Sequence, residues 1–565
     1  MSTWNIHGVI ESFDSESNEG IHPLVLRILK QRGFSEDDIA SFLNPQYEHL
    51  NDPFLFRDMR AVVDRIRTAR DAGEHVFVYG DYDADGVTSS TLMVETLREV
   101  GIREVDVYIP HREREGYGLN NSAIDLIKSE GGSLIITVDC ATSNAAEITY
   151  AKGLGIDVII IDHHEEPEVL PSDAFAVLNP HMTGETYPFK QLAACGVVFK
   201  TVQALWQSFD LPAGHEKWFL DLVAIATVAD MMPLVGENRI FVSFGLKVLN
   251  KTRRPGLKAL VETAAAKGDI GVYEIGFVIG PRLNAAGRID HANNSFELLA
   301  QTDEKASREL AAALDRTNTE RQSETERILK DAQEQAKEQY EAGKKVLCAK
   351  GDDWQAGVVG LASGRITERY YRPSLVVTMV NGRMTGSGRS IPGFNITEAL
   401  QRSSEFLERF GGHEGACGFT LASPDALMPF VESMNRIADS LLVEEDLVKK
   451  RAIDLEMPLS LVDWDVVGAL EEMSPFGIGN PRPTFASRGV RVDTVSLVGS
   501  DGKHMRIMFN DGKRQVQAIA FGFGEKWHDV LNPGDLADIA YEVSVNEWQG
   551  RKSIQLKIAD INHHT

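Results

Sequence analysis

The segment Tyr79-Gly80-Asp81-Tyr82-Asp83-Ala84-Asp85-Gly86 places three carboxylates within five positions, directly after the apolar run 75–80. Like charges about 4 Å apart repel by roughly 1 kcal/mol in water and by more in a partly dry site. Such a cluster therefore either takes up protons or binds a cation. The pattern predicts that Asp81, Asp83 and Asp85 bind a divalent cation at the end of a buried strand.

The same segment matches the opening of a calcium-binding EF-hand loop, Asp-x-Asp-x-Asp-Gly. An EF-hand loop carries a bidentate glutamate at its twelfth position, where this chain has Leu92. An EF-hand also follows a helix, whereas the residues before Asp81 form a strand-like apolar run. These two differences exclude an EF-hand.

Two further strand-like runs end in acids. SLIITVD (133–139) ends at Asp139, and DVIIID (157–162) ends at Asp162, which His163 and His164 follow. Ligands of open parallel sheets bind at the carboxyl ends of the strands. We therefore expect Asp81, Asp83, Asp85, Asp139 and His163 to converge although about eighty residues separate the first from the last.

A fourth apolar run, 221–230, is typical of a buried helix with an acid at each end. Nine steps of about 100° put Asp221 and Asp230 on opposite faces, so only one of them can join the site. Mixed carboxylate and imidazole ligands suit manganese or magnesium, and their number is enough for two ions that share an aspartate. A pair of such ions indicates phosphoryl chemistry. Helix caps or turns would explain any one of these acids but not the set.

The elements around these residues predict several domains. Short β-rich runs alternate with helical patterns from residue 74 to about 180, as in a parallel sheet flanked by helices. Residues 301–342 contain 18 charged residues and neither glycine nor proline, as in a long solvent-exposed helix. We interpret them as a helix between two domains, the alternative being a surface helix within one continuous domain.

The predicted fold class is multidomain α/β. In chain order we expect a helical N-terminal segment (1–50), a parallel-sheet catalytic domain (51–300), a connecting helix (301–343), a smaller α/β domain (344–450) and a C-terminal OB-like β-barrel (451–565).

The composition describes an ordinary folded protein. With 565 residues, 43% hydrophobic and 25% charged, the chain is neither a single small module nor wholly disordered. Its net charge of −25 argues against a general affinity for nucleic acid or anionic lipid, so any polyanion must be bound locally. Four widely spaced cysteines, no leader-like N-terminus and no long apolar run indicate the cytosol.

These residues together resemble the DHH phosphoesterase superfamily, and within it most closely the RecJ family. The resemblance rests on six segments in order: the 81–85 cluster, Asp139, Asp162-His163-His164, AIATVADMMPL with Asp230, and the two later motifs PRLNAAGR (281–288) and SPFGIGNP (474–481). GSGRS (386–390) and Gly411-Gly412-His413 are similar to the DHHA1 substrate-binding domain. Ala141 and Gln355 depart from the family, where glycine and histidine are common.

The resemblance implies roles for the acidic residues. It implies one ion held by Asp81, Asp83 and Asp139, and a second held by Asp85, Asp139, His163 and Asp230. His164 would face the scissile phosphate. Asp162 would then orient an imidazole, since metal-bound histidines usually have such a partner. The implied catalytic residues are His164, Asp139 and Asp162.

Arginines with small neighbours suit phosphate, because the guanidinium forms a planar fork and small residues admit further donors. Each arginine alone could equally be a surface residue in an ion pair. The resemblance implies that Arg112, Ser387 and Arg389 bind a terminal 5′ phosphate. The remaining predicted DNA-binding residues are Tyr117, Arg282, Asn284, Arg288, His413 and Trp548.

Two of these predictions compete with simple structural explanations. A loop histidine such as His413 is often satisfied by backbone, and only its Gly-Gly-His context favours a DNA contact. Aromatics of the barrel could stack bases, but Phe485 and Phe509 equally suit a core, whereas Trp548 stands in a turn-like segment.

The predicted function is a 5′ to 3′ exonuclease specific for single-stranded DNA that releases nucleoside 5′-monophosphates with two Mn²⁺ or Mg²⁺ ions, in bacterial recombination and repair. One alternative is a DHH phosphodiesterase of short oligoribonucleotides or cyclic dinucleotides. Another is an inactive scaffold that binds single strands. The expected partners are single-stranded DNA, a helicase and a single-strand-binding protein, with the enzyme a monomer in the bacterial cytosol.

Overall fold

The computed structural model describes residues 3–13, 20–112, 114–266, 268–289, 291–499 and 502–564. The chain divides into two compact units. The larger unit comprises Gln46–Val443 with Gly477–Gly479, and the smaller unit comprises Met1–Pro45, Glu444–Phe476 and Asn480–Thr565. None of the helices among these residues has the length and apolarity that crossing a membrane requires.

The larger unit begins with a five-stranded parallel sheet in the order β3-β2-β4-β5-β6. The predicted runs 75–80, 133–139 and 157–162 coincide with three of these strands to within one residue, and the short strand β6 was not predicted. The strands are β2 (His75–Gly80), β3 (Val105–Tyr108), β4 (Gly132–Val138), β5 (Asp157–Ile161) and β6 (Ala176–Leu178). Because all five run the same way, their carboxyl ends share one edge.

Helices cover both faces of this sheet. Val78 and Ile136 belong to one apolar core, and their neighbours Tyr79 and Ile135 belong to the other, as the alternation of strand side chains requires. The helices of this domain are α3 (Met59–Ala72), α4 (Ala84–Glu99), α5 (Asn121–Ser129), α6 (Ala145–Gly153), α7 (Ala194–Ser208), α8 (Leu220–Ala229), α9 (Gly236–Leu249), α10 (Pro255–Thr263), α11 (Val272–Glu274), α12 (Gly280–Ile289) and α13 (Asn293–Ala300). Helices α3, α4 and α7 pack on one face of the sheet, and α5 and α6 on the other.

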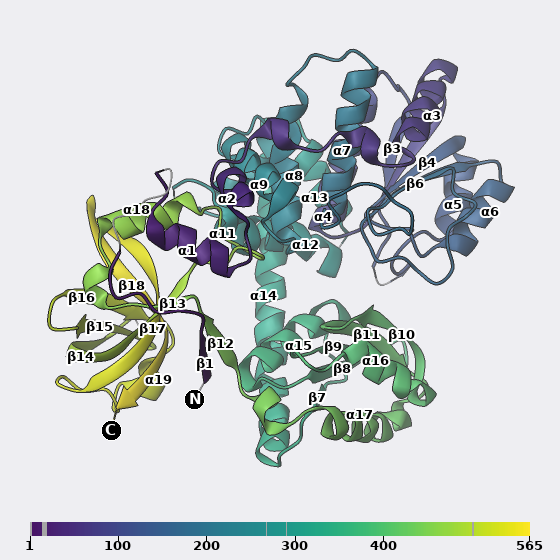
Figure 1. The fold of residues 1–565 in the computed structure, drawn as a ribbon. Helices are drawn as coiled ribbons and strands as arrows, with labels where there is room; N and C mark the ends of the chain where they lie inside the picture. Colours follow the sequence, from purple (N-terminus) through teal and green to yellow (C-terminus); the bar gives the residue numbers. More distant parts are fainter. Residues whose placement is uncertain are drawn as a thin grey trace. The chain divides into compact units, whose positions relative to one another are not determined.

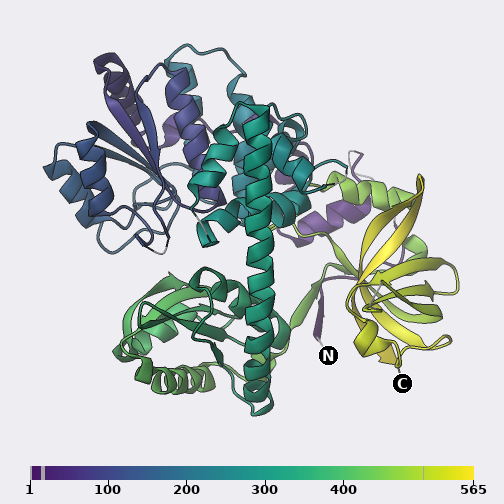
Figure 2. The same ribbon diagram turned by 180° about the vertical axis from the view of Figure 1, so that it is seen from behind.

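The helix α14 (Glu304–Glu341) leads from this domain to the second sheet of the same unit (Figures 1 and 2). It begins where the Asp303 side chain accepts a hydrogen bond from the Ala306 N–H, at 2.8 Å. Its 38 residues contact α10 and α12 near one end and α15 (Ala356–Tyr370) and β7 near the other. The long connecting helix of the predicted fold class is therefore confirmed.

The second sheet has the order β10-β11-β9-β8-β7, in which only β7 and β8 are parallel. Its strands are β7 (Leu347–Lys350), β8 (Ser374–Val380), β9 (Arg383–Arg389), β10 (Leu407–His413) and β11 (Ala416–Leu421), with helices α15, α16 (Ile396–Arg402) and α17 (Leu427–Leu441). The smaller α/β domain of the predicted fold class is therefore confirmed.

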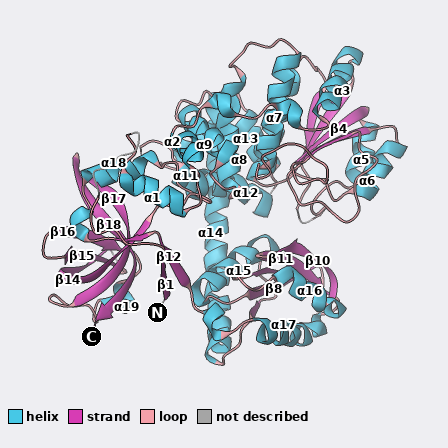
Figure 3. Ribbon diagram, viewed as in Figure 1, coloured by secondary structure: helices cyan, strands magenta, loops and turns pink. Residues whose placement is uncertain are grey.

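The smaller unit is built on a six-stranded sheet in the order β13-β14-β15-β16-β18-β17, and the additional pairing of β14 with β17 closes it into a barrel (Figure 3). The strands are β13 (Leu455–Glu456), β14 (Thr484–Val498), β15 (His504–Asn510), β16 (Gln515–Ala520), β17 (Leu536–Trp548) and β18 (Arg551–His564), with helices α18 (Trp464–Glu472) and α19 (Gly524–Trp527). The OB-like barrel of the predicted fold class is confirmed, although β14 was not predicted.

The N-terminal residues contribute to this smaller unit. The predicted helical segment contains α1 (Pro23–Gln31) and α2 (Glu36–Leu43), but it also contains the strand β1 (Thr3–Ile6). Strand β1 pairs in parallel with β12 (Lys450–Ile453), and the apolar side of α1 joins the core of the barrel. An amphipathic helix of nine residues is short for independent stability, so α1 depends on this core.

Candidate metal centre and phosphate pocket

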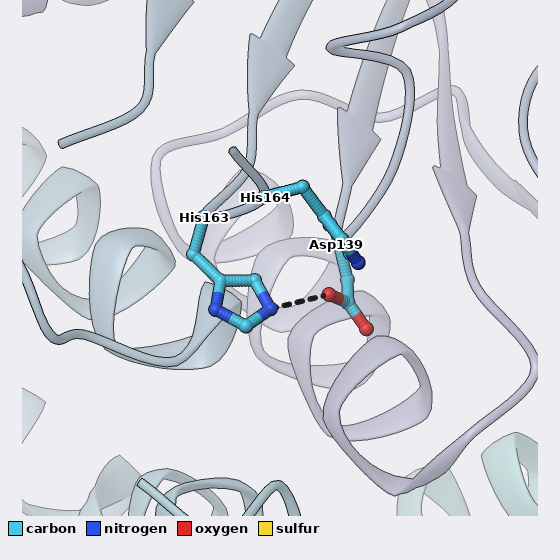
Figure 4. A group of neighbouring side chains, drawn as sticks. All are labelled: Asp139, His163 and His164. Atoms are coloured by element: carbon cyan, nitrogen blue, oxygen red, sulfur yellow. Dashed lines mark ion pairs between the residues drawn. The ribbon is translucent and has the colours of Figure 1, made fainter. Parts of the chain in front are cut away.

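The carboxyl edge of the first sheet gathers the predicted acidic and histidine side chains. His163 Nε2 lies 3.2 Å from Asp139 Oδ1, 3.6 Å from Asp230 Oδ2 and 3.9 Å from Asp85 Oδ2. Figure 4 shows His163 pointing toward the Asp139 carboxylate, with His164 beside it. Residues separated by 145 positions thus meet at one point.

Two triads of this cluster have ligand atoms that all lie within 4.8 Å of one another. One triad consists of Asp81, Asp83 and Asp139, and the other of Asp85, His163 and Asp230. Asp139 also forms a group with His163 and His164. Asp139 therefore stands between the two triads, where a carboxylate shared by two ions would have to be.

The start of α4 holds two of the carboxylates in place. Asp83 caps the helix by accepting hydrogen bonds from the N–H groups of Asp85 and Gly86. Asp85 accepts hydrogen bonds, both at 2.8 Å, from Ala194 N and Cys195 N at the beginning of α7. The N-termini of two helices, with their partial positive charge, thus face the acidic centre.

The backbone at this edge takes conformations that L-residues rarely adopt. Asp139 has φ 61°, Ala141 has φ 83° and Met231, next to Asp230, has φ 58°. Left-handed backbone costs a non-glycine residue roughly 1–2 kcal/mol. Such positions concentrate at functional sites. The φ of Ala141 also gives a physical reason for the glycine that is common at this position in the resembling family.

The electrostatics of the centre require positive charge. Burial, followed by repulsion from neighbouring carboxylates, raises the pKa of Asp85 to about 7 and that of Asp230 to about 9. The same two causes raise the pKa values of Asp81 and Asp139 well above their ordinary range. Asp81 Oδ1 and Asp230 Oδ2 are buried and accept no hydrogen bond from the described residues. Oxygen and imidazole donors with unsatisfied lone pairs fit divalent cations of the Mn²⁺ or Mg²⁺ class.

Asp162 lies behind this centre and belongs to neither triad. Its carboxylate accepts hydrogen bonds from His163 N at 2.7 Å and Thr142 Oγ1 at 2.6 Å, and lies 2.7 Å from His164 Nδ1. Burial lowers the pKa of His164, but the hydrogen bond and charge of Asp162 outweigh it and raise that pKa to about 9. Asp162 therefore orients His164, whose side chain remains 45% exposed.

In the metal-free protein, Asp162→Asn should lower the pKa of His164 from about 9 toward the ordinary 6.5, as followed by NMR titration of the imidazole. Because the folded pKa is the higher one, protonated His164 stabilises the fold fully below pH 6.5, and this contribution is lost as the pH rises through 9. Thr142→Val keeps the carboxylate charge and should shift the pKa far less. A pKa that Asp162→Asn leaves at 9 would contradict the assignment.

Asp221 and Asp230 separate as predicted for the two ends of a helix. Asp230 caps the end of α8 in the acidic centre. Asp221 is buried at the other end, where Arg254 Nε lies 3.4 Å and Thr252 Oγ1 2.9 Å from its carboxylate. Only Asp230 is available to a metal ion.

A small cavity of about 250 Å³ opens between the two sheet domains of the larger unit. Arg112, Arg288, Ser387 and Arg389 line it together with the glycines of α15, β10 and β11. Burial, together with the charge of Arg112, lowers the pKa of Arg288 to about 10. Several guanidinium groups without an acid among the lining residues favour a dianion such as a phosphate.

A larger groove of about 890 Å³ adjoins this cavity and shares Arg112, Gly357 and Ser387 with it. Tyr82 and Tyr117 line the groove. The Tyr117 hydroxyl donates to the Asp139 carbonyl at 3.2 Å and lies 3.3 Å from His164 Nδ1. The groove therefore leads from the arginine-lined cavity to the acidic centre.

Four predicted DNA-binding residues line neither the small cavity nor the groove. Arg282 forms an ion pair with Asp315 at 2.9 Å, and the Asn284 amide oxygen accepts a hydrogen bond from Ala84 N at 2.7 Å. His413 is exposed, and its Nδ1 accepts a hydrogen bond from Gly415 N at 3.2 Å. Trp548 ends β17 in the smaller unit and is 71% exposed. The side chains of Arg282, Asn284 and His413 therefore already have partners within the protein, which was the alternative to a DNA contact.

Sequence reasoning missed an exposed aromatic pair on the turn that packs against the last residues of α8. Tyr273 and Phe277 are 65% and 69% exposed, and their rings stack with centroids 4.8 Å apart. Phe277 lies in the π-helical turn Ile275–Ile279, which packs on α8 through Gly276 and Gly280. The i, i+4 spacing of two aromatics is also typical of a core helix, so no sequence signal distinguished them.

Family models match three parts of the chain. The DHH family N-terminal domain matches residues 75–227, the DHHA1 domain matches 343–440, and the RecJ OB domain matches 453–560. These matches agree with the order of the two sheet domains and the barrel.

Relatives match over most of their length. The single-stranded-DNA-specific exonuclease RecJ of Bacillus subtilis is 38% identical, covering 99% of this chain and 70% of that protein. The Escherichia coli exonuclease of the same name is 33% identical, covering 86% of this chain and 87% of that protein. The structure of Thermus thermophilus RecJ in complex with Mn²⁺ matches with a TM-score of 0.84 at 27% identity, covering 99% of this chain and 79% of that chain. A structure of exonuclease RecJ bound to manganese is 31% identical, with a TM-score of 0.60 over 70% of this chain and 96% of that one. With its fold, its motifs and its relatives in agreement, this chain belongs to the RecJ family of single-stranded-DNA-specific exonucleases.

Proposed function

We propose that this protein is a metal-dependent exonuclease that degrades single-stranded DNA from the 5′ end and releases nucleoside 5′-monophosphates. The observation that carries the proposal is the pair of ligand triads around Asp139, connected by one groove to an arginine-lined cavity. The relatives described above are named single-stranded-DNA-specific exonucleases.

Two divalent cations, Mn²⁺ or Mg²⁺, would be held by Asp81, Asp83 and Asp139 and by Asp85, Asp139, His163 and Asp230. When bound, they would supply an activated water and stabilise negative charge on the phosphate. The chain itself supplies the carboxylates and keeps them in place through the N-termini of α4 and α7. Without cations the same residues repel one another, as their raised pKa values indicate.

His164 would bind the scissile phosphate. In the metal-free protein the hydrogen bond and charge of Asp162 raise the pKa of His164 to about 9, and as an imidazolium His164 would donate a hydrogen bond to a non-bridging phosphate oxygen. Tyr117 would hold the ring in position, since its hydroxyl contacts both His164 and the Asp139 carbonyl. Charge-assisted hydrogen bonds of this kind are strongest where water is excluded.

The arginine-lined cavity would set the polarity. A terminal 5′ phosphate held by Arg112, Ser387 and Arg389 leaves the first nucleotide in the groove and directs the next phosphate to the metal centre. Water then adds to that phosphorus while its bond to the 3′ oxygen of the first nucleotide breaks. The released nucleotide carries the old 5′ phosphate, and the shortened strand carries a new one that can bind the cavity again.

The remaining DNA contacts stay predictions. We propose that Arg288 contacts phosphate in the cavity, and that Trp548 of the barrel stacks on bases. Arg282, Asn284 and His413 would contact DNA only in addition to the intramolecular contacts described above. The enzyme would act as a monomer in the bacterial cytosol, with a helicase and a single-strand-binding protein supplying the strand.

The exposed rings of Tyr273 and Phe277 would stack on bases of a long single strand. Replacing both residues with alanine should therefore lower kcat/KM on long single strands by about 10- to 100-fold, since each base stack contributes roughly 1–3 kcal/mol. Cleavage of a 5′-phosphorylated dinucleotide should change little, because its two bases lie inside the groove. Initial rates on both substrates test this. Tyr150→Ala, an exposed tyrosine of α6, is the control. Equal losses on both substrates would refute a stacking role.

Digestion of single strands labelled at either end, with Mn²⁺ or Mg²⁺, tests the function. We expect the 5′ label to appear first, as a mononucleotide, and duplex DNA to resist. Earlier release of the 3′ label would contradict the polarity. Binding without release of any nucleotide, with either ion, would favour the scaffold alternative, and preference for dinucleotides over long strands would favour the oligonucleotide phosphodiesterase.

A further inference from the structure

A second cavity, of about 450 Å³, lies in the larger unit at the end of α8 that is remote from Asp230. Asp221, the acid at the start of that helix, lines the cavity, and Asp230 follows it nine positions later in the chain. At 1.5 Å per residue, the two ends of α8 are roughly 14 Å apart. The cavity is therefore separate from the metal centre and from the groove that leads to it.

One wall of this cavity is aromatic. Trp206, Trp218 and Phe219 line it, and the Trp206 and Phe219 rings meet edge to face with centroids 5.7 Å apart. The guanidinium of Arg253 lies 3.8 Å from the centre of the Trp218 ring. Guanidinium and indole planes in contact form a flat surface on which a planar ligand can stack.

Two arginines at the rim of the cavity have unpaired guanidinium groups. Three arginines and three carboxylates line the cavity, so its total charge is balanced. Arg254 is paired with Glu95 at 2.5 Å and with Asp221 at 3.4 Å. Arg98 and Arg253 are exposed and form no ion pair with any described residue, so their N–H groups can bind a phosphate.

We propose that this cavity binds a nucleoside 5′-monophosphate. The base would stack on the Trp218–Arg253 surface, and the phosphate would bind Arg98 and Arg253. Apolar ligands would leave the two guanidinium groups unused, and inorganic phosphate would leave the aromatic wall unused. The cavity has the volume of a small-molecule site. The proposal rests on the proposed function in one respect: nucleoside 5′-monophosphates are the compounds that the exonuclease would release.

Calorimetric titration of the full-length protein with deoxyadenosine 5′-monophosphate tests the proposal. The protein would carry Arg389→Ala, which disables the phosphate cavity of the active site, and would be kept in a chelator. We expect one remaining site with a Kd on the order of 10–100 µM. Adding Arg253→Ala or Trp218→Ala should weaken it at least about tenfold, the effect of losing one stacked base. Arg60→Ala, another arginine stacked on an aromatic ring, should leave it unchanged.

Three results would overturn the proposal. The first is that the Arg389→Ala protein does not bind the nucleotide. The second is that both Arg253→Ala and the milder Arg253→Gln leave nucleotide binding intact. The third is that inorganic phosphate binds as tightly as the nucleotide. Crystals soaked with 5-iododeoxyuridine 5′-monophosphate give an independent readout, because iodine should produce an anomalous peak beside Trp218. Digestion of end-labelled strands by Arg253→Ala should stay at the wild-type rate, so a failure of the exonuclease proposal would be seen separately.

Discussion

An Asp139→Asn protein should still bind single-stranded DNA but hydrolyse it about 10³-fold more slowly than the wild type. Asp139 stands between the two ligand triads, so its loss weakens both metal sites. Metal ions contribute several kcal/mol of transition-state stabilisation, and about 4 kcal/mol corresponds to 10³ in rate. Asparagine is preferable to alanine because Asp139 has φ 61°, a conformation that asparagine tolerates. Single-turnover hydrolysis of an end-labelled strand measures the effect.

The same substitution should stabilise the metal-free protein. Burial and the neighbouring carboxylates raise the pKa of Asp139, so its ionised form opposes folding at neutral pH. A neutral amide removes that repulsion, and each kcal/mol gained should raise Tm by about 2–4 °C. With Mn²⁺ present the order should reverse, because cation binding stabilises the wild type more. Calorimetric scans with chelator and with Mn²⁺ test both halves.

Two further aspartates serve as controls. Asp125→Asn, on the exposed side of α5, should change neither rate nor Tm appreciably. Asp221→Asn should destabilise the protein in both conditions, because this buried carboxylate already has a cationic partner in Arg254. An Asp139→Asn protein with normal turnover, or with a lower Tm than the wild type in chelator, would show that Asp139 does not connect two cation sites.

Arg389→Ala should lower kcat/KM on 5′-phosphorylated strands by about 30- to 100-fold and should have little effect on strands with a 5′ hydroxyl. Arg389 lines the small cavity with Arg112, Arg288 and Ser387, and losing one half-buried phosphate contact costs about 2–3 kcal/mol. The wild type should therefore prefer phosphorylated ends, and the variant should lose that preference. Rates for both enzymes on both substrates form a double-mutant cycle between the arginine and the phosphate.

Arg383→Ala is the matched control for this experiment. Arg383 lies on the same strand, β9, and lines the adjoining groove, but it is paired with Glu408 at 2.9 Å. Its loss should reduce rates on both substrates alike, if at all. Equal losses for Arg389→Ala on phosphorylated and hydroxyl ends would place the 5′ phosphate elsewhere and remove the physical basis for the polarity.

The sequence alone predicted those features of the metal centre that depend on where a strand ends. The positions of Asp81, Asp139 and Asp162 relative to their strands were readable because a buried parallel strand is a short apolar run whose last residue is easily recognised. Parallel pairing then forces those ends onto one edge. The helix α14 was equally readable, since 38 residues without glycine or proline have few alternatives.

Strand β14 is an element that its sequence pattern did not predict. Its burial alternates poorly because it bends to pair with both β15 and β17, and exposed Arg488 and Gly489 interrupt the pattern. A barrel strand that changes partners has no single period, so its 15 residues gave no clear signal.

Which residue types could bind cations, and that parallel strands would bring them together, could be predicted from the amino-acid sequence, because both depend on local pattern and on a general rule of sheet geometry. The partner of each arginine could not be predicted in this way. Arg282 and Arg288 share one motif, yet the first is paired with Asp315 and the second lines the arginine-lined cavity with residues a hundred positions away. A long side chain on a helix takes the partner that packing places within its reach, and that packing is a property of the whole fold.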